Sequence, residues 1–258
     1  MRVMARGTYP AKRGDKKVTD GTTAASKAGS TSSLERMTLL FVWALPAWAT
    51  LLLLATLTHQ PPYQTRFGAW SRYVTTPEFL LSHLVGSILG GALGILGFVG
   101  LGLLLVGQED RRTRGRAVPG VVCSVIGNVF VTAVFGIAAF AQPAIGRSYL
   151  AGHADVRALY DDVNGVPLLV TALCGVLLLS LGVVLLGLGV VRSRVAPAWA
   201  GWCLVVGAPV FAIIGVVLAD VVQTVGAAML FVGSVGTAYA VERRHRAVAH
   251  HTLSGADS

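Results

Sequence analysis

The chain has 258 residues, of which 54% are hydrophobic and only 13% are charged, and its formal net charge is +9 at pH 7. Soluble domains are about 25% charged, so this composition, with a mean hydropathy of +0.68, excludes an ordinary soluble protein and indicates a membrane protein. The basic residues lie in short segments between apolar runs, without interleaved aromatics on a soluble domain, so the charge predicts no nucleic-acid partner.

Residues 1–36 are rich in Gly, Ser, Thr, Lys and Arg and lack an apolar period, which predicts a disordered basic tail in the cytoplasm. All four lysines of the chain lie in this tail, and the remaining basic residues are arginines. Two readings of that change stay open: a separate tail, or a start codon assigned too early, with Met37 as the true first residue.

Six apolar segments follow, and each is long enough to cross a hydrocarbon core of ~30 Å, which needs ~20 helical residues. They cover about 38–58, 79–107, 117–141, 166–191, 199–218 and 221–241. We therefore expect an all-α fold, a polytopic bundle of six transmembrane helices over 37–242, followed by a short cytoplasmic tail over 243–258. The last two spans form one apolar stretch, and the turn between them is expected near the polar Asp220 and Gln223.

Prolines punctuate these spans. Pro77, Pro119, Pro167 and Pro197 each lie where a span is predicted to start, a position at which the missing N–H costs nothing. Pro209 lies inside a predicted span and should kink it.

The basic residues also predict the orientation. If the N-terminus is inside, 17 of the 21 lysines and arginines lie in the cytoplasmic tails and loops, and only Arg66, Arg72, Arg147 and Arg157 lie outside. The short loops alone show the same bias, so the positive-inside rule predicts that both termini are cytoplasmic.

The second span carries a stripe of small residues. Ser82, Gly86, Gly90 and Gly94 recur every four residues, and Gly97 follows three further on. Small residues at this spacing let a neighbouring helix approach closely, because association in lipid depends on packing. The spacing does not decide whether that neighbour belongs to the same chain or to another subunit.

A few polar residues within the spans are candidates for function. His83 lies on nearly the same face as the glycine stripe, and Ser124, Asn128 and Thr132 form a narrow polar stripe in the third span. With Asp220 and Gln223 near the outer mouth, they would line a path for a solute or ion. The plainer alternative is that they form structural hydrogen bonds between helices.

The outer loops are predicted to be partly structured. Loop 59–78 carries Tyr63, Phe67, Trp70 and Tyr73, which suit an aromatic belt at the membrane interface. Loop 142–165 contains a short amphipathic helix at about 153–164. Either segment would suit a cap over a cavity or a docking site for a partner.

No motif predicts catalysis, a metal or a cofactor. Cys123, Cys174 and Cys203 all lie in apolar runs without a CxxC pair, and the histidines and carboxylates of the outer loops lack a recognised ligand spacing. The sequence has no HExxH, GxSG or Walker A pattern. We therefore expect a protein that is not an enzyme.

The segment Tyr73-Val-Thr-Thr-Pro-Glu-Phe-Leu-Leu-Ser-His-Leu84 leads into the glycine-rich span, and arginine far outnumbers lysine. In these features the chain resembles small multi-pass membrane proteins of high-GC Gram-positive bacteria. The resemblance implies a bacterial cytoplasmic membrane but no activity or site residue.

The expected function is that of a non-catalytic accessory or assembly subunit, whose partners are the lipid bilayer and either another membrane protein or a second copy. The alternative is a small-molecule or ion transporter with a path near His83, Asn128, Asp220 and Gln223. An intramembrane enzyme or redox protein is the least favoured hypothesis, because few ionisable groups lie within the spans.

Overall fold

The computed structural model describes the backbone of residues 20–57, 60–153, 155–214 and 220–254, and the side chains of 33–57, 60–153, 155–214 and 221–247. The chain divides into two compact units, Met1–Arg36 and Met37–Ser258. Residues 20–36 of the first unit are helical and form the start of α1, so the helix begins inside the predicted tail.

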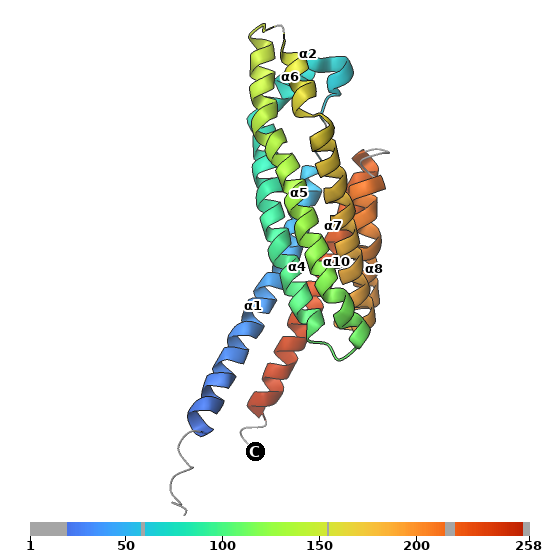
Figure 1. Ribbon diagram of the computed structural model, residues 1–258. Helices are drawn as coiled ribbons and strands as arrows, with labels where there is room; N and C mark the ends of the chain where they lie inside the picture. The colour runs from blue at the N-terminus through green and yellow to red at the C-terminus, as the bar shows by residue number, and fades with distance from the viewer. Residues whose placement is uncertain (1–19, 58–59, 154, 215–219, 255–258) are drawn as a thin grey trace, which may run out of the picture. The chain divides into compact units, whose positions relative to one another are not determined.

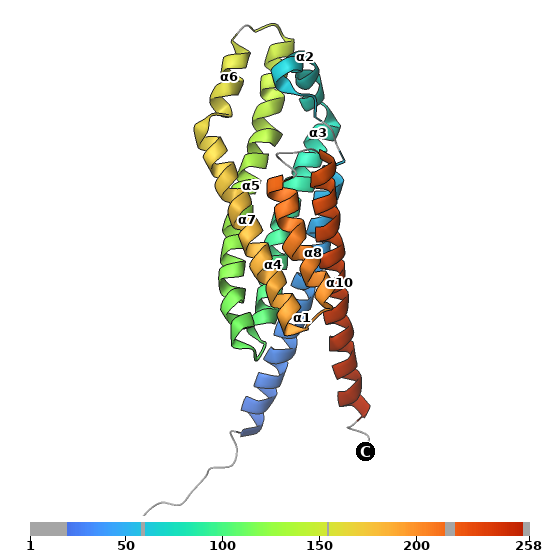
Figure 2. The same ribbon diagram turned by 90° about the vertical axis from the view of Figure 1, so that its right-hand side faces the viewer.

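All regular secondary structure in the described ranges is helical (Figures 1 and 2). In chain order the elements are α1 (Asp20–Ala55), α2 (Tyr63–Val74), α3 (Pro77–Leu81), the π-helix η1 (Ser82–Leu89), α4 (Gly90–Val106), α5 (Arg111–Leu150), α6 (Val156–Val163), α7 (Val166–Ser193), α8 (Ala198–Pro209), the π-helix η2 (Val210–Ile214) and α10 (Asp220–Ser254). Both views place α2 and α6 together at one end of the bundle, called here the cap end.

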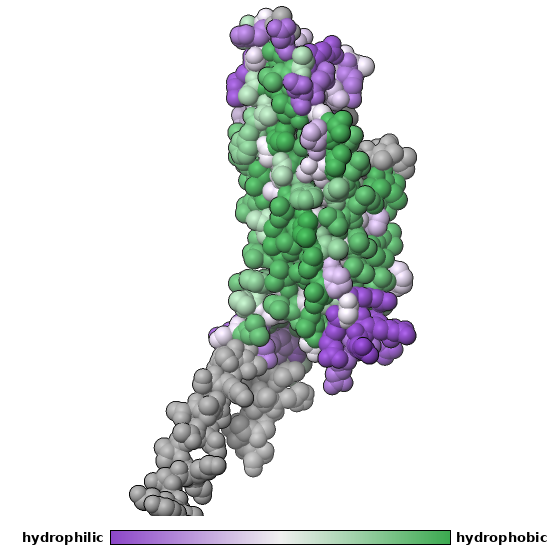
Figure 3. Space-filling view, in the orientation of Figure 1, coloured by the Kyte–Doolittle hydropathy of each residue, from purple (hydrophilic) through white to green (hydrophobic). Residues whose placement is uncertain are grey.

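Five helical stretches are long and apolar enough to cross a membrane: Ser33–Ala55, Pro77–Val106, Arg111–Leu150, Val156–Ser193 and Val221–Ala247. A sixth apolar stretch, Ala198–Ile214, is shorter. Figure 3 shows a continuous hydrophobic band between two hydrophilic ends, as expected for a helical bundle embedded in lipid. The fold is therefore an all-helical bundle with membrane-spanning character.

The third predicted span differs most from the structure. It was expected over 117–141, but α5 has 40 residues and is therefore about 60 Å long at 1.5 Å per residue. Asp110 begins it, because its carboxylate accepts a hydrogen bond of 3.0 Å from the backbone N–H of Thr113. Pro119 consequently lies inside the helix instead of at its first turn, whereas Pro77 and Pro167 do occupy first-turn positions.

The turn between the fifth and sixth spans was expected near Asp220 and Gln223, but Gln223 is helical, and residues 215–219 before it lie outside the described residues. Helix α10 begins at Asp220, so Gln223 belongs to its first turn. At the other end, α10 continues to Ser254, through most of the segment that was expected to be a short tail.

The aromatic residues of the first outer loop form a core instead of an interfacial belt. Trp70 is 0% exposed, and Phe67, Phe79 and Tyr160 are buried with it in a cluster that joins α2, α3, α5 and α6. The Trp70 and Tyr160 rings meet edge to face, with centroids 4.9 Å apart. Helix α6 lies within the amphipathic segment predicted at 153–164, and Tyr160 is on its buried face.

The membrane-embedded core depends on close approach of backbones. A Cβ added at Gly127 of α5 would lie 2.2 Å from the backbone nitrogen of Leu179 in α7, and one at Gly182 would lie 2.2 Å from that of Ser124. Only glycine permits this separation, because any larger side chain would clash with the facing backbone. The close approach matters because lipid gives no hydrophobic drive, and dispersion contacts must hold the helices together. Trp48 of α1 adds an edge-to-face contact with Phe98 of α4, at 5.1 Å between centroids.

The opposite end of the bundle, called here the arginine end, is held by polar contacts. Arg192, in the last turn of α7, donates to the Asp110 carboxylate over 2.7 Å. The hydroxyl of Thr113 and the guanidinium of Arg192 hold the pKa of Asp110 at about 2, below its ordinary value. Arg244 of α10 donates to the carbonyl of Arg194, the residue that ends α7 in a left-handed conformation with φ of 55°.

Candidate functional site

Two adjoining cavities lie within the membrane-embedded part of the bundle. The larger one, called here the chamber, has a volume of about 110 Å³ and receives polar groups from Thr56, Ser82, His83, Ser87 and Gln223. The smaller one, called the inner pocket, has a volume of about 20 Å³ and includes Asn128 and Thr132. Leu52, Ser87, Phe135 and Phe211 line both cavities, which places them next to each other.

The chamber lies toward the cap end because its polar groups come from helix ends there. Thr56 follows the last turn of α1, η1 follows directly on α3, and Gln223 lies in the first turn of α10. A water molecule needs roughly 10–15 Å³ of cavity measured in this way. The inner pocket therefore has room for about one water, whereas the chamber has room for several waters or a small polar solute.

Local helix geometry brings the η1 side chains to one side. Thr76 begins α3 by accepting a hydrogen bond of 3.2 Å from the N–H of Phe79, and the helix then changes to π geometry at Ser82. A π-helix bonds residue i to i+5, which widens the turn, and Ser82, His83 and Ser87 of η1 all line the chamber. Short π segments recur at functional sites, and η2, which begins after Pro209, contributes Phe211 to the same cavities.

His83 is half-buried and anchored through one ring nitrogen. Its Nδ1 lies 2.9 Å from the carbonyl oxygen of Phe79 and 3.2 Å from Ser82 Oγ. A carbonyl oxygen can only accept, so Nδ1 carries the hydrogen in this bond, and Nε2 of the neutral ring is an acceptor. Phe79 and Phe135 lie beside the ring, with centroids 4.1 Å and 6.2 Å away.

Asn128 joins α5 to α4 at the inner pocket. Its Nδ2 donates to the carbonyl oxygen of Gly91 over 2.6 Å, and the side chain is buried. A Cβ at Gly91 would lie 2.4 Å from Thr132 Oγ1, so this glycine lets the two polar side chains of α5 approach α4. The hydrogen bond is structural and at the same time fixes the carboxamide at the wall of the pocket.

The structure brings four of the six predicted path residues to these cavities. They are His83, Asn128, Thr132 and Gln223. Ser124 instead faces the seam between α5 and α7, where Gly182 contacts it, and its buried hydroxyl finds no hydrogen-bond partner in the described part of the chain. The side chain of Asp220 lies outside the described residues.

The glycine stripe of the second span faces α1 of the same chain. A Cβ at Gly86 would lie 3.2 Å from Ala55 Cβ, one at Gly94 2.9 Å from Trp48 Cδ1, and one at Gly97 2.6 Å from Leu45 Cγ. Gly90 lies against Leu51 in the same way. Ser82, the first member of the stripe, lines the chamber and donates to the carbonyl of Phe79 over 2.9 Å.

Three lining residues had no signal in the sequence. Phe135 and Phe211 are ordinary apolar residues of their spans, and Thr56 lies at the end of the first one. Only packing shows that they close the cavities. Helical spacing did place Ser87 on the face of His83 and Gly86, so that residue was open to prediction.

The chamber offers hydrogen-bonding groups without a fixed charge. His83 is the one ionisable side chain among its described lining residues, and the others are hydroxyls, one amide and apolar groups. Within the described ranges, no three His, Cys, Asp or Glu side chains come together as a metal site would need. Such a lining suits a small uncharged polar molecule.

No protein-family model matches the chain, and neither curated proteins nor solved structures show a significant similarity to it.

Proposed function

We propose that this chain is a multi-pass protein of the bacterial cytoplasmic membrane that binds a small uncharged polar solute in the chamber and carries it across the bilayer. The observation that supports this most is the convergence of polar residues from separate helices on adjoining cavities. His83 and Gln223 are 140 residues apart in the sequence and Asn128 lies between them, yet all three line these cavities. Polar groups within spans mark solute pathways in membrane proteins.

The proposed topology has six spans with both termini in the cytoplasm. In support of it, Ala198–Ile214 is apolar, and its 17 residues would cover about 26 Å of a core of ~30 Å. The described loop and tail arginines of the arginine end include Arg112, Arg194 and Arg243, and a cytoplasmic position for this end follows the positive-inside rule. The chamber then lies toward the outer surface.

The proposed carrier has access to the chamber from one side. Toward the arginine end, the core is filled by Leu101, Leu105, Leu186 and Val190, all fully buried or nearly so. A solute leaving toward the cytoplasm would need these side chains to separate. The π-helices η1 and η2 both line the chamber and are the natural places for such a change, because their backbone hydrogen bonds are already shifted from α geometry.

The first test asks whether water reaches the chamber. In a variant without Cys123, Cys174 and Cys203, Ser87→Cys should react with a small polar thiol reagent at least tenfold faster than Leu89→Cys. Both positions lie on η1, but Leu89 is 50% exposed on the outer face of the bundle and would face lipid. Thiol reagents need the thiolate, which forms in water and not in hydrocarbon. Equal rates would count against an aqueous chamber.

The second test measures transport. Proteoliposomes are mixed rapidly with urea or glycerol, and stopped-flow light scattering follows the entry of the solute. His83→Leu and Asn128→Leu should each lower the flux at least tenfold, whereas Leu89→Ala, on the lipid face, should not. If both chamber variants keep full flux while remaining folded, the path is not through the chamber.

A non-catalytic accessory or assembly subunit is the second candidate, and the cap favours it. Helices α2 and α6 share a buried core at the cap end, and there Arg157 donates to the carbonyl of Gln64 over 3.0 Å and lies 5.4 Å from the Phe67 ring centroid. A folded surface beyond the bilayer suits a docking partner. Native mass spectrometry of the protein taken gently from its membrane tests this: a heteromer of fixed stoichiometry supports it, and a lone monomer or homo-oligomer supports the carrier.

A further inference from the structure

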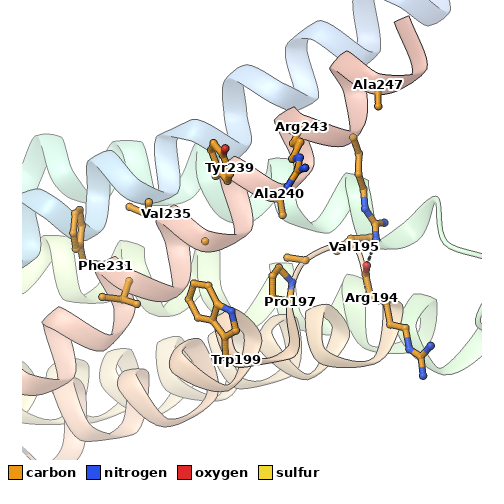
Figure 4. Close-up of a pocket in the computed structure, with 14 residues that line it drawn as sticks. Arg194, Val195, Pro197, Trp199, Phe231, Val235, Tyr239, Ala240, Arg243 and Ala247 are labelled. Carbon is orange, nitrogen blue, oxygen red and sulfur yellow. Dashed lines mark hydrogen bonds between the residues drawn. The ribbon is translucent and has the colours of Figure 1, made fainter. Parts of the chain in front are cut away.

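A further cavity shares no lining residue with the chamber. It is a groove of about 870 Å³ at the arginine end, bounded by the segment Arg194–Pro197, by α8 and by α10 (Figure 4). Its volume is within the usual range for ligand sites, ~300–1,000 Å³. The groove therefore has room for a ligand much larger than any solute that the chamber could hold.

One part of the groove is an apolar wall that faces the lipid. Trp199 of α8 is 51% exposed, and Phe231, Val232 and Val235 of α10 lie along the same groove. Figure 4 shows the Trp199 ring between α8 and α10. A Cβ at Gly236 would lie 2.4 Å from Trp199 Cη2, so the glycine lets the indole approach α10 closely. This wall suits a hydrocarbon chain.

The other part of the groove is a cationic mouth. Arg194, Arg243 and Arg244 line it, and no carboxylate is among the described lining residues. Glu242 is next in sequence but accepts hydrogen bonds from Arg246 and from Trp43 Nε1, so its charge is engaged elsewhere. Arg244 donates to the carbonyl of Arg194, and this bond connects α10 to the end of α7 at the mouth.

We propose that this groove binds one anionic phospholipid, with its phosphate at Arg243 and Arg244 of α10 and an acyl chain along Trp199 and Val235. The combination of an apolar wall with a cationic mouth selects an amphiphile whose negative group lies at the membrane surface. A free anion would use the arginines but not the wall, and a zwitterionic lipid would leave the mouth's positive charge without a counterpart. The site depends on the membrane placement of the bundle and is independent of solute transport through the chamber.

The test uses the full chain in nanodiscs that contain equal amounts of phosphatidylglycerol and phosphatidylcholine. Native mass spectrometry after release counts the lipids that stay bound, and titration in detergent gives the Kd of each lipid. We expect one retained phosphatidylglycerol per chain and no comparable retention of phosphatidylcholine. Equal retention of the two lipids would overturn the proposal.

Matched variants assign the binding to the groove. Arg243→Gln with Arg244→Gln should weaken the binding of phosphatidylglycerol about 30-fold, at about 5-fold for each arginine near the headgroups. Arg112→Gln with Arg114→Gln removes the same charge from the exposed start of α5, outside the groove, and should leave the retained lipid in place. If this control weakens binding as much, the attraction is diffuse and the groove is not the site.

A third variant separates a lipid from a free anion. Val235→Trp fills the apolar wall and leaves every arginine in place, and should lower phosphatidylglycerol retention at least tenfold. Unchanged retention would show that the wall takes no part, and the proposal of a lipid site would fail. The arginine variants are at exposed positions and do not disturb the core, so they test the proposal even if Val235→Trp does not fold.

Discussion

The seam between α5 and α7 makes a sharp prediction about stability. Gly127→Ala adds one methyl group at a point where the Cβ would lie 2.2 Å from the backbone nitrogen of Leu179 and 2.8 Å from the carbonyl oxygen of Gly175. Both neighbours are backbone atoms and cannot rotate away. The two helices would have to separate by roughly 1 Å to restore ordinary contact, and dispersion contacts along the seam would weaken.

The magnitude follows from two opposed effects. Overpacking of this kind costs about 1–3 kcal/mol, and the replacement of glycine by alanine in a helix returns up to about 1 kcal/mol. Gly136→Ala in the same helix is the matched control, because nothing lies within 4 Å of its Cβ. The difference between the two variants removes the helix-propensity term and should be about 1–3 kcal/mol, with Gly127→Ala less stable.

The assay is unfolding by sodium dodecyl sulfate in mixed micelles, followed by far-UV circular dichroism. Gly127→Ala should unfold at a lower detergent fraction than Gly136→Ala, with the same helical content at the start. If the two variants have the same midpoint, α5 and α7 do not approach as closely as their glycines indicate.

Three further predictions concern the two ends and the inner pocket. Because the pKa of Asp110 is held at about 2 in the folded protein, its carboxylate contributes fully to stability when the pH is above the ordinary pKa of an aspartate. That contribution is lost as the pH falls toward 2, and the melting temperature measured against pH should show this loss in the wild type but not in Asp110→Asn. Trp70→Ala should cost about 3–5 kcal/mol within the cap, seen as faster hydrogen exchange of α2 and α6, whereas Tyr239→Ala, at a site 61% exposed, should change exchange there little. Asn128→Leu removes the hydrogen bond to Gly91 and should cost about 0.6–2 kcal/mol in the same detergent titration; an unchanged midpoint would mean that the bond adds nothing.

Helix positions were largely predictable, since apolar runs of about 20 residues have few other structures open to them in lipid. The ends were less so. Asp110 begins α5 well before Pro119, because a helix that leaves the bilayer continues wherever capping and local contacts support it. The buried core of the cap escaped prediction because the same aromatics that suit an interface also suit a core, and the choice depends on how α2 and α6 pack together.

The candidate path was predictable in part. His83, Asn128, Thr132 and Gln223 stand out in sequence because polar side chains are costly within a span, and they do line the adjoining cavities. Ser124 shares the helical stripe of Asn128, yet it faces α7 instead, since a stripe of three residues covers an arc wide enough to meet two neighbouring helices.

The sequence by itself determined that this protein is a helical membrane protein, because its apolar runs cannot be reconciled with water and its small-residue spacing requires close helix contact. Which helices meet was decided only by the tertiary structure. Gly94 and Gly97 face α1 and not another subunit, and the arginines of α10 meet those at the end of α7 to form a groove. Residue spacing defines the face of a helix, but it does not identify the neighbour on that face, since every apolar helix presents a similar surface to lipid.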